Sequence, residues 1–278
     1  MKNFKNKNII ITGGSSGIGF ALATQFAQFG SNLFLISRRL SLLETAKSQL
    51  LMQFGASLKI EIYAVDVQNE VAIQQTIENI GNQHGGIDLL INNAGIASQV
   101  RFDTICYKDL KNMMNINYYG AVYTTKSAWR FLHQSKGHVA FVSSVAGYTG
   151  VYGYTYYTPT KFALTGLVET LRMEAKDFGI GVTIIYPPDT DTPMLHKEHE
   201  NAIPETLALA AGAHILDADF VAQKLIKGIQ ANQFEVYCNF QSKLIRWLRG
   251  ISPQLYFYML DQIIVTDRKK RGVLLYPV

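Results

Sequence analysis

The sequence IIITGGSSGIG, residues 9–19, passes from an apolar run directly into a glycine-rich turn. The three isoleucines predict a short buried strand, because β-branched side chains pack well on a sheet. Gly13, Gly17 and Gly19 permit a tight turn and a close approach of the backbone to a ligand. The stretch therefore predicts a strand, a turn and the start of a helix.

The helix predicted after the turn places Leu22, Phe26 and Phe29 on one face, at the spacing of a core-facing stripe. Its amino-terminal end offers free N–H groups and the positive end of the helix dipole to an anion. The glycine spacing is G-x-x-x-G-x-G rather than the commoner G-x-G-x-x-G, and plain turns also use glycine. The position directly after an amino-terminal strand favours the pyrophosphate of a dinucleotide over a plain turn. The candidate contacts here are Gly13, Ser15, Ser16, Gly17, Ile18 and Gly19.

The residues after the second predicted strand, 32–36, indicate which dinucleotide binds. An NAD enzyme has an acidic residue there that accepts the ribose 2′-hydroxyl. This chain instead has Ser37, Arg38 and Arg39, whose hydroxyl and guanidinium groups suit a 2′-phosphate through charge-assisted hydrogen bonds. The sequence therefore predicts NADP(H), and the alternative is that both arginines are solvated at a helix start.

Predicted strands alternate with helical stretches along the chain, as a doubly wound parallel α/β sheet requires. Asp66 and Val67 follow the third strand and are candidate cofactor contacts. Asp66 either contacts the adenine or caps the next helix, and the sequence favours neither. Because 278 residues contain no internal repeat and no low-complexity linker, we expect one catalytic domain over residues 1–240. The strands are expected at residues 8–12, 32–36, 59–65, 87–92, 138–143, 181–186 and 234–238.

A second group of residues supplies a proton donor. Tyr157 and Lys161 lie four apart, so on a helix they share a face. A phenol has an ordinary pKa of about 10, and a nearby ammonium is expected to lower this pKa toward the working range of a general acid. Ser144 follows the fifth predicted strand and is expected at the carboxyl edge of the sheet, where ligands bind. Because proline is tolerated near a helix start, Pro159 predicts that the helix begins near Thr155 or kinks there.

The glycine-rich turn and the Tyr157–Lys161 pair together predict a nicotinamide-dependent carbonyl reductase or alcohol dehydrogenase, whereas Tyr-x-x-x-Lys alone is common on ordinary helices. These motifs resemble those of the short-chain dehydrogenase/reductase family over roughly residues 5–240. The resemblance implies a Rossmann-type fold and a catalytic set of Asn117, Ser144, Tyr157 and Lys161, in which Asn117 holds a proton-relay water and Lys161 also holds the ribose. It assigns further cofactor contacts to Asn93, Ala94, Gly95, Tyr157, Lys161, Pro187, Thr190 and Thr192.

The stretch after the sixth predicted strand departs from the family pattern. It reads Tyr-Pro-Pro-Asp-Thr-Asp-Thr-Pro at residues 186–193, where Pro188 replaces the usual glycine, changes the turn and removes a backbone donor. This stretch and residues 150–166 are similar to those of family members that reduce the 3-keto group of long-chain sphingoid bases with NADPH. The similarity implies reduction of 3-ketodihydrosphingosine to dihydrosphingosine in sphingolipid biosynthesis. The alternatives are a reductase of 3-oxoacyl thioesters or steroid-like ketones, and a non-catalytic NADPH-binding sensor or scaffold.

The segment at about residues 193–217 is expected to form a lid over the substrate. Its His196, Glu198, His199 and Glu200 place two histidines on one helix face, but a third converging ligand is not evident. We therefore expect no metal and interpret these four as exposed lid residues. Four further tyrosines are expected to line an acyl channel or to serve plain packing: Tyr148, Tyr152, Tyr154 and Tyr156.

The C-terminal extension, residues 241–278, is expected to be amphipathic and basic. Apolar and basic residues alternate between Lys243 and Ile251, and the basic run 268–271 follows. The longest uncharged run, 250–260, has 11 residues, fewer than the about 20 that a spanning helix needs. This composition predicts a helix lying on an anionic membrane surface. The alternative is packing on the body of the protein or on a partner subunit.

The cysteines, the amino-terminal residues and the net charge bear on the compartment and the partners of the protein. Cys106 and Cys238 lack metal or redox spacing, which suits a reducing cytosol. The chain enters its first strand within ten residues without an apolar signal region, so we expect a cytoplasmic protein, with peripheral contact to a membrane. The net charge is +5, but the sequence contains no nucleic-acid-binding motif, so we expect no nucleic-acid partner. The family resemblance implies a homo-oligomer, either a dimer or a tetramer.

Overall fold

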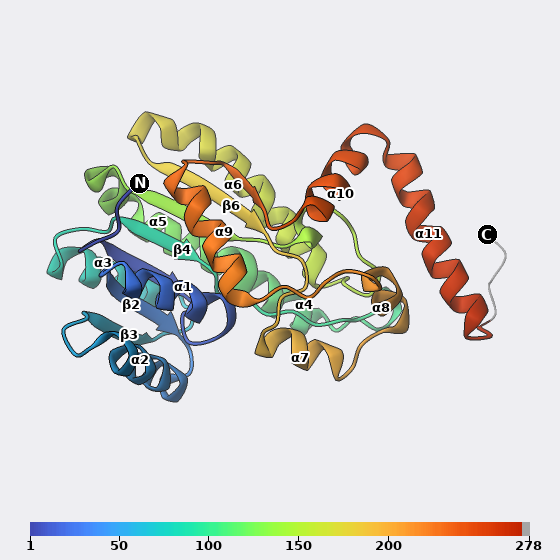
Figure 1. Ribbon diagram of the computed structural model, residues 1–278, viewed down its shortest axis with the longest axis horizontal. Helices are drawn as coiled ribbons and strands as arrows, with labels where there is room; N and C mark the ends of the chain where they lie inside the picture. Colours follow the sequence, from blue (N-terminus) through green and yellow to red (C-terminus); the bar gives the residue numbers. More distant parts are fainter. Residues whose placement is uncertain (274–278) are drawn as a thin grey trace.

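A seven-stranded parallel sheet forms the centre of the molecule, with helices on both faces (Figure 1). The structure is a computed structural model that describes residues 1–273. The predicted doubly wound sheet is confirmed, and every strand end lies within two residues of its predicted position. In sheet order the strands are β3 (Ile60–Ala64), β2 (Asn32–Ser37), β1 (Asn8–Thr12), β4 (Leu89–Asn92), β5 (His138–Val142), β6 (Gly181–Tyr186) and β7 (Glu235–Tyr237).

The strand order reverses between β1 and β4, which are neighbours at the middle of the sheet. In open α/β sheets, ligands bind at the carboxyl ends of the strands beside such a reversal. The loop after β1 and the loop after β4 therefore flank the expected ligand site. These loops carry the two glycine-containing motifs of the sequence.

The residues of β1 are fully buried because helices cover both faces of the sheet. Ile9 and Ile11 pack in one core with Leu22, and Ile10 packs in the opposite core with Ile77. Alternation of side chains along the strand therefore ties the two cores together. One face carries α1 (Gly17–Gln28), α2 (Leu40–Phe54) and α9 (Ala218–Gln230), and the other carries α3 (Glu70–Gln83), α5 (Gly120–Ser135) and α6 (Tyr157–Phe178).

The predicted apolar stripe on α1 is confirmed at two of its three positions. Leu22 and Phe26 are fully buried. Phe29 is 43% exposed, because it follows the last residue of the helix and rests on the edge of the core. Its ring lies 5.5 Å from that of Phe4.

The last helices pack against the carboxyl-end side of the molecule, to which α11 (Pro253–Lys270) is attached at its edge (Figure 1). The Tyr256 hydroxyl lies 2.8 Å from Oγ1 of Thr149, and Arg268 forms an ion pair of 2.9 Å with Glu205 on α8 (Pro204–Ala210). Packing on the protein body is thus present in this region. Within residues 1–273, no helix is long and apolar enough to span a membrane. Residues 274–278 of the predicted extension lie outside the described chain; the extension begins with α10 (Phe240–Ile251).

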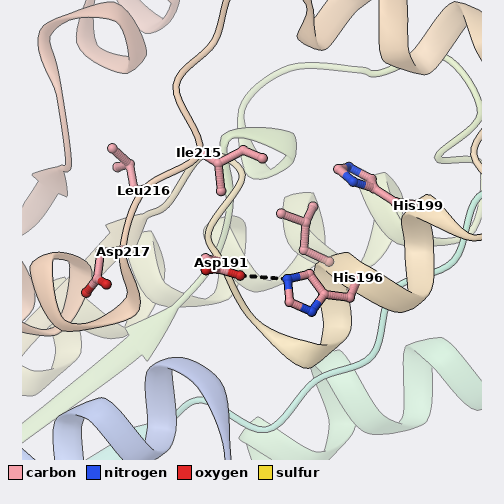
Figure 2. Close-up of a pocket in the computed structure, with 7 residues that line it drawn as sticks. Asp191, His196, His199, Ile215, Leu216 and Asp217 are labelled. Carbon is pink, nitrogen blue, oxygen red and sulfur yellow. Dashed lines mark hydrogen bonds and ion pairs between the residues drawn. The ribbon is translucent and has the colours of Figure 1, made fainter.

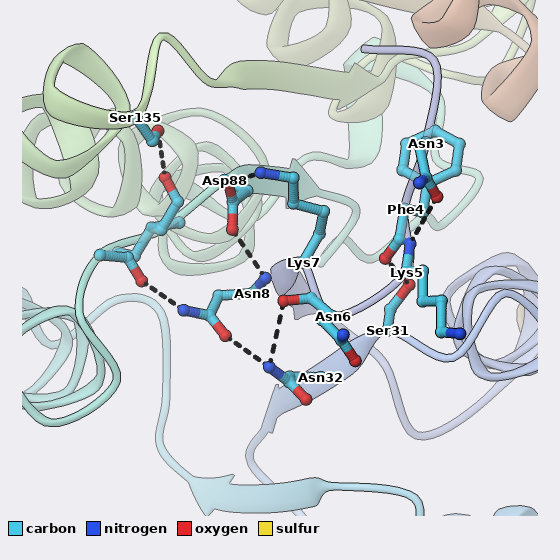
Figure 3. A network of polar contacts seen from close by, with 12 residues as sticks. Asn3, Phe4, Lys5, Asn6, Lys7, Asn8, Ser31, Asn32, Asp88 and Ser135 are labelled. Atoms are coloured by element: carbon cyan, nitrogen blue, oxygen red, sulfur yellow. Dashed lines mark hydrogen bonds and ion pairs between the residues drawn. The ribbon is translucent and has the colours of Figure 1, made fainter.

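A polar network fixes the amino ends of the central strands, opposite the ligand edge (Figure 3). Nδ2 of the buried Asn8 donates to the carbonyl oxygens of His84 at 2.9 Å and Gly86 at 3.0 Å. Its Oδ1 accepts from Nδ2 of Asn32 at 2.9 Å. Oδ2 of Asp88 accepts from the backbone N–H of Asn8 at 2.9 Å. This network joins β1, β2 and the segment that enters β4.

The Asn8→Ala variant should be less stable than the wild type by about 1–3 kcal/mol, because the change removes a buried side chain that donates to two part-buried carbonyl groups. The measurement is the free energy of unfolding in urea. Asn3→Ala is the control, since Asn3 is exposed and accepts a local bond from Lys5, and it should change stability by about 0.5 kcal/mol or less. Equal losses in the two variants would contradict a structural role for the network.

Candidate active site

The glycine-rich turn between β1 and α1 leaves space for a phosphate group at the helix terminus. Gly13 and Gly17 have φ angles of 68° and 53°, in the left-handed region that favours glycine. A Cβ atom on Gly19 would overlap the carbonyl oxygen of Gly13 and lie 2.5 Å from Nδ2 of Asn93. In the described part of the chain the N-cap Ser16 makes no side-chain capping bond, which leaves the first N–H groups of α1 available to an anion. The turn therefore fits the pyrophosphate of a dinucleotide.

Thr12 joins this turn to the loop after β4. Its Oγ1 accepts hydrogen bonds from the backbone N–H groups of Asn93 at 3.0 Å and Ala94 at 3.1 Å. Nδ2 of Asn93 donates in return to the carbonyl oxygen of Thr12 at 3.0 Å. A Cβ on Gly95 would lie 3.3 Å from Oδ1 of Asn117, so this loop also approaches the catalytic candidates. Sequence reasoning missed the part played by Thr12, whose signal is a hydroxyl at the end of an otherwise apolar strand.

The candidate 2′-phosphate site lies at the carboxyl end of β2. Oγ of Ser15 donates to Oγ of Ser37 at 3.0 Å, so the glycine-rich turn after β1 contacts the carboxyl end of β2 directly. Arg38 and Arg39 are exposed there, and Nη1 of Arg38 lies 3.8 Å from Oδ2 of Asp66. Two exposed guanidinium groups beside a serine fit a phosphate by charge and by hydrogen bonding.

Asp66 does not cap the helix that follows. The N-cap of α3 is Asn69, whose Oδ1 accepts from the N–H of Ala72 at 3.1 Å. Oδ1 of Asp66 instead accepts from the N–H of Gln68 at 3.0 Å in a local turn. The capping interpretation is therefore wrong, and the adenine contact remains a prediction. Val67 is buried beside this turn.

Tyr157, Ser144 and Lys161 converge at the carboxyl end of β5. Ser144 lies two residues beyond the strand, and its hydroxyl is within hydrogen-bonding reach of the Tyr157 phenol. Nζ of Lys161 donates to the carbonyl oxygen of Val142 at 3.0 Å and lies 5.5 Å from the centre of the Tyr157 ring. The structure thus brings these three predicted residues together, with Tyr157 and Lys161 one helical turn apart on α6 and Ser144 in the loop after β5. Their chemical roles remain predictions.

The start of α6 accommodates Pro159 in the first turn. The helix begins at Tyr157, two residues after the predicted start near Thr155. The N–H of Thr158 donates to the carbonyl oxygen of Tyr154 at 2.9 Å, so helical bonding reaches back before the first assigned residue. Pro159 stands in the first turn of the assigned helix, where its missing N–H is tolerated.

Asn117 lies in a π-helix, Asn115–Tyr119, between α4 (Tyr107–Met114) and α5. Its Oδ1 accepts from the N–H of Ile96 at 2.8 Å, and its Nδ2 donates to the carbonyl oxygen of Ile96 at 2.9 Å and to Oγ1 of Thr160 at 3.0 Å. The carboxamide therefore ties the loop after β4 to the first turn of α6. The proton-relay role implied by the family resemblance remains a prediction.

The pKa of the Tyr157 phenol is raised, not lowered. Burial is the main cause, and the carboxyl groups of Glu198 and Asp189 add to it, while the hydrogen bond with Ser144 lowers the pKa. Burial also lowers the pKa of Lys161 to about 8. The predicted lowering of the phenol pKa is wrong for this structure, because desolvation outweighs the favourable contacts.

The residues predicted to contact the nicotinamide line the loop after β6. The carbonyl oxygen of Pro187 accepts from the N–H of Val145 at 3.0 Å, and Oγ1 of Thr190 donates to the carbonyl oxygen of Pro188 at 2.8 Å. Thr192 is the N-cap of α7 (Pro193–His199), and its Cγ2 would lie 3.0 Å from a Cβ on Gly17. The loop after β6 therefore contacts the glycine-rich turn at Gly17. The nicotinamide contacts of Pro187, Thr190 and Thr192 remain predictions.

Of the four tyrosines predicted near the substrate, Tyr154 faces the reacting groups. Its ring centre lies 5.3 Å from that of Tyr157. Tyr148 and Tyr156 are buried, and their hydroxyls bond to the carbonyl oxygen of Ser242 and to the backbone N–H of Cys106. The packing interpretation thus holds for these two. The remaining hydroxyl, of Tyr152, accepts from Nη2 of Arg268 at 2.9 Å.

The segment predicted to form a lid contains α7 and α8, and its role as a lid remains a prediction. With the loop after β6 it lines a cavity of about 380 Å³, in which Nε2 of His196 lies 2.7 Å from Oδ1 of Asp191 (Figure 2). His199, on the same helix, also lines this cavity. Among residues 1–273, no group of three or more acidic, histidine or cysteine side chains is placed to hold a metal. Glu198 departs from its expected exposure: it is half-buried and turned toward Tyr154.

Comparison with known proteins agrees with this geometry. A family model described as short chain dehydrogenase matches residues 7–203. The chain is 34% identical to a 3-ketodihydrosphingosine reductase of Dictyostelium discoideum, over 97% of this chain and 86% of that protein. It is 35% identical to a 3-dehydrosphinganine reductase of Danio rerio, over 81% of this chain and 69% of that protein. A solved short-chain dehydrogenase/reductase from Burkholderia phymatum in complex with NAD has the same fold, with a TM-score of 0.81 at 22% identity over 92% of this chain and 96% of that chain.

The Gly19→Ala variant should bind NADPH about tenfold more weakly or worse, because the added methyl group overlaps the Gly13 carbonyl and strains the turn by about 1–3 kcal/mol. Fluorescence titration with NADPH measures the loss. Gly250→Ala is the matched control, since a Cβ there has open space in the described structure, and it should bind NADPH as the wild type does. Unchanged affinity in Gly19→Ala would show that the cofactor does not use this turn.

Proposed function

The chain belongs to the short-chain dehydrogenase/reductase family, and on this premise we propose that it reduces 3-ketodihydrosphingosine to dihydrosphingosine with NADPH. One observation carries the proposal: the Tyr157 phenol and the Ser144 hydroxyl lie together at the sheet edge that also holds the glycine-rich turn. The names of the relatives, which match this chain over most of its length, support the substrate. The exposed Arg38 and Arg39 support NADPH over NADH.

The protein groups at this edge suffice to polarise and protonate a ketone. When bound, NADPH supplies a hydride for the ketone carbon. The Ser144 hydroxyl donates a hydrogen bond to the ketone oxygen, and Tyr157 transfers its proton to that oxygen as negative charge develops there. The carbonyl thereby becomes a CH–OH group. Lys161, buried beneath the phenol, attracts the ribose hydroxyls, and Asn117 holds the start of α6 in register with the loop after β4.

The Tyr157→Phe variant should lose turnover by about 10²–10⁴-fold, because it lacks the proton donor, while its NADPH affinity stays unchanged. The measurement is the loss of NADPH absorbance with 3-ketodihydrosphingosine, run beside NADH and beside a 3-oxoacyl thioester. We expect the wild type to prefer NADPH and the sphingoid ketone. Activity on the thioester alone would favour a fatty-acyl reductase, and NADPH binding without oxidation on any ketone would favour a sensor or scaffold.

We further propose a cytoplasmic homo-oligomer that contacts a membrane through α10 and the start of α11. Leu244, Trp247 and Ile251 share one face of α10 and are 44%, 59% and 64% exposed. Lys243 is exposed beside them. An apolar face with basic neighbours suits the boundary between headgroups and acyl chains of an anionic bilayer. A long-chain substrate would partition into the same layer.

The Trp247→Glu, Ile251→Glu double variant should bind anionic vesicles at least about tenfold more weakly, since each buried side chain contributes about 1.5–3 kcal/mol. Co-sedimentation with phosphatidylserine-containing vesicles measures the change. Met52→Glu is the control, because Met52 is 86% exposed on α2, away from the proposed surface, and it should bind vesicles like the wild type. If the wild type does not sediment, or if the double variant binds equally well, α10 faces protein or solvent instead.

A further inference from the structure

Two acidic side chains from separate elements face the reacting phenol. Glu198 comes from α7 of the lid and lies beside the hydroxyl of Tyr154. Asp189 comes from the loop after β6, where its carbonyl oxygen accepts from the N–H of Leu216 at 2.9 Å. Both carboxyl groups act on the pKa of Tyr157 by raising it, so both lie within electrostatic reach of the proton donor.

The position of the Glu198 carboxyl is energetically unfavourable in the absence of a ligand. Within residues 1–273 its Oε1 is buried and has no hydrogen-bond partner. A buried carboxylate oxygen without a donor is unfavourable. The pKa of Glu198 is raised to about 7, mainly by burial, while the hydrogen bond with Tyr154 lowers it and the charge of Asp189 adds to the rise. Burial raises the pKa of Asp189 as well. A positive group between the two would supply the missing donor and stabilise both charged forms.

Neither Lys161 nor His199 donates to Oε1 of Glu198. The ammonium of Lys161 donates to the carbonyl oxygen of Val142. His199 is exposed and lines the outer cavity of the lid, from which it lowers the pKa of Asp189. The unpartnered Oε1 of Glu198 therefore points to a cation brought by the ligand.

We propose that Glu198 and Asp189 bind a protonated primary amine on the carbon next to the ketone that Tyr157 protonates. This inference rests on the proposed function and narrows its substrate class to 2-amino ketones. In 3-ketodihydrosphingosine the amine is bonded to the carbon adjoining the ketone, so a ketone within reach of Ser144 brings its ammonium beside the phenol. That ammonium donates to Oε1 of Glu198. It also offsets the negative field of the two carboxyl groups on Tyr157.

The same arrangement explains discrimination against other ketones. A 3-oxoacyl thioester or a steroid-like ketone brings no cation, so it leaves the Glu198 oxygen unpaired and the phenol surrounded by negative charge. A site built to pair a polar group rejects analogues that lack it, because its own buried group then loses a partner. Glu198 and Asp189 therefore act as specificity-determining residues, separate from the groups that carry out the proton transfer.

The test compares two ketones that differ in the amine alone: 3-ketodihydrosphingosine and its analogue with hydrogen in place of the amine. In Glu198→Gln and in Asp189→Asn, kcat/KM for the amine-bearing ketone should fall about tenfold to a hundredfold, as expected for loss of a charge-assisted hydrogen bond. The value for the deaminated ketone should not fall, since no such bond is lost and each variant removes a negative charge from the surroundings of the phenol. Glu200→Gln is the matched control, because Glu200 is exposed at the end of the same helix and should leave both values unchanged.

Equal losses on the two ketones, or no loss on either, would overturn the inference and leave the proposed function standing. If the wild type reduces neither ketone, the proposed function fails, and calorimetric binding to the NADP-loaded protein decides the inference alone. Tighter binding of dihydrosphingosine than of its N-acetyl derivative, abolished in Glu198→Gln, supports an amine site. Equal binding of the two ligands overturns it. Unchanged thermal unfolding and NADPH affinity in the variants show that the fold is kept.

Discussion

The contact between the turn after β1 and the loop after β4 is the constraint on which the site depends. Thr12 and Asn93 exchange backbone and side-chain hydrogen bonds across it, and Gly19 fits against it because it has no side chain. The same loop continues to Ile96, which Asn117 holds by two hydrogen bonds, and Asn117 in turn reaches the first turn of α6. One continuous set of bonds therefore aligns the dinucleotide turn with the proton donor.

Much of the fold and part of the site follow from local patterns in the sequence. Runs such as Ile9–Ile11 are apolar throughout because their strands are buried on both faces, so their positions could be predicted closely. The four-residue spacing of Tyr157 and Lys161 places both on one side of α6 whatever surrounds them. The family resemblance then adds residues such as Asn117, whose contacts no local pattern reveals.

The features of the site that the sequence did not predict depend on contacts between residues far apart along the chain. The pKa of Tyr157 is raised by burial and by Glu198, which stands on α7, 41 residues further along the chain. Tyr148 looked like a candidate for the substrate channel, yet its hydroxyl bonds to Ser242, 94 residues away. The basic run near the C-terminus is likewise not simply solvated, because Arg268 pairs with Glu205. Composition predicts a basic face but not its acidic counterpart.

The π-helix at Asn115–Tyr119 has a consequence for how this chain can vary in evolution. A π-helix is in effect an α-helix that carries one inserted residue, and it widens the turn that contains Asn117. Deleting a single residue there would restore a regular helix and rotate everything before it by about 100° relative to α5. Substitutions on the outer face of α4 leave this geometry intact. The length of this segment is therefore as important to the site as its chemistry, because a one-residue deletion would move Asn117 away from the loop that it holds.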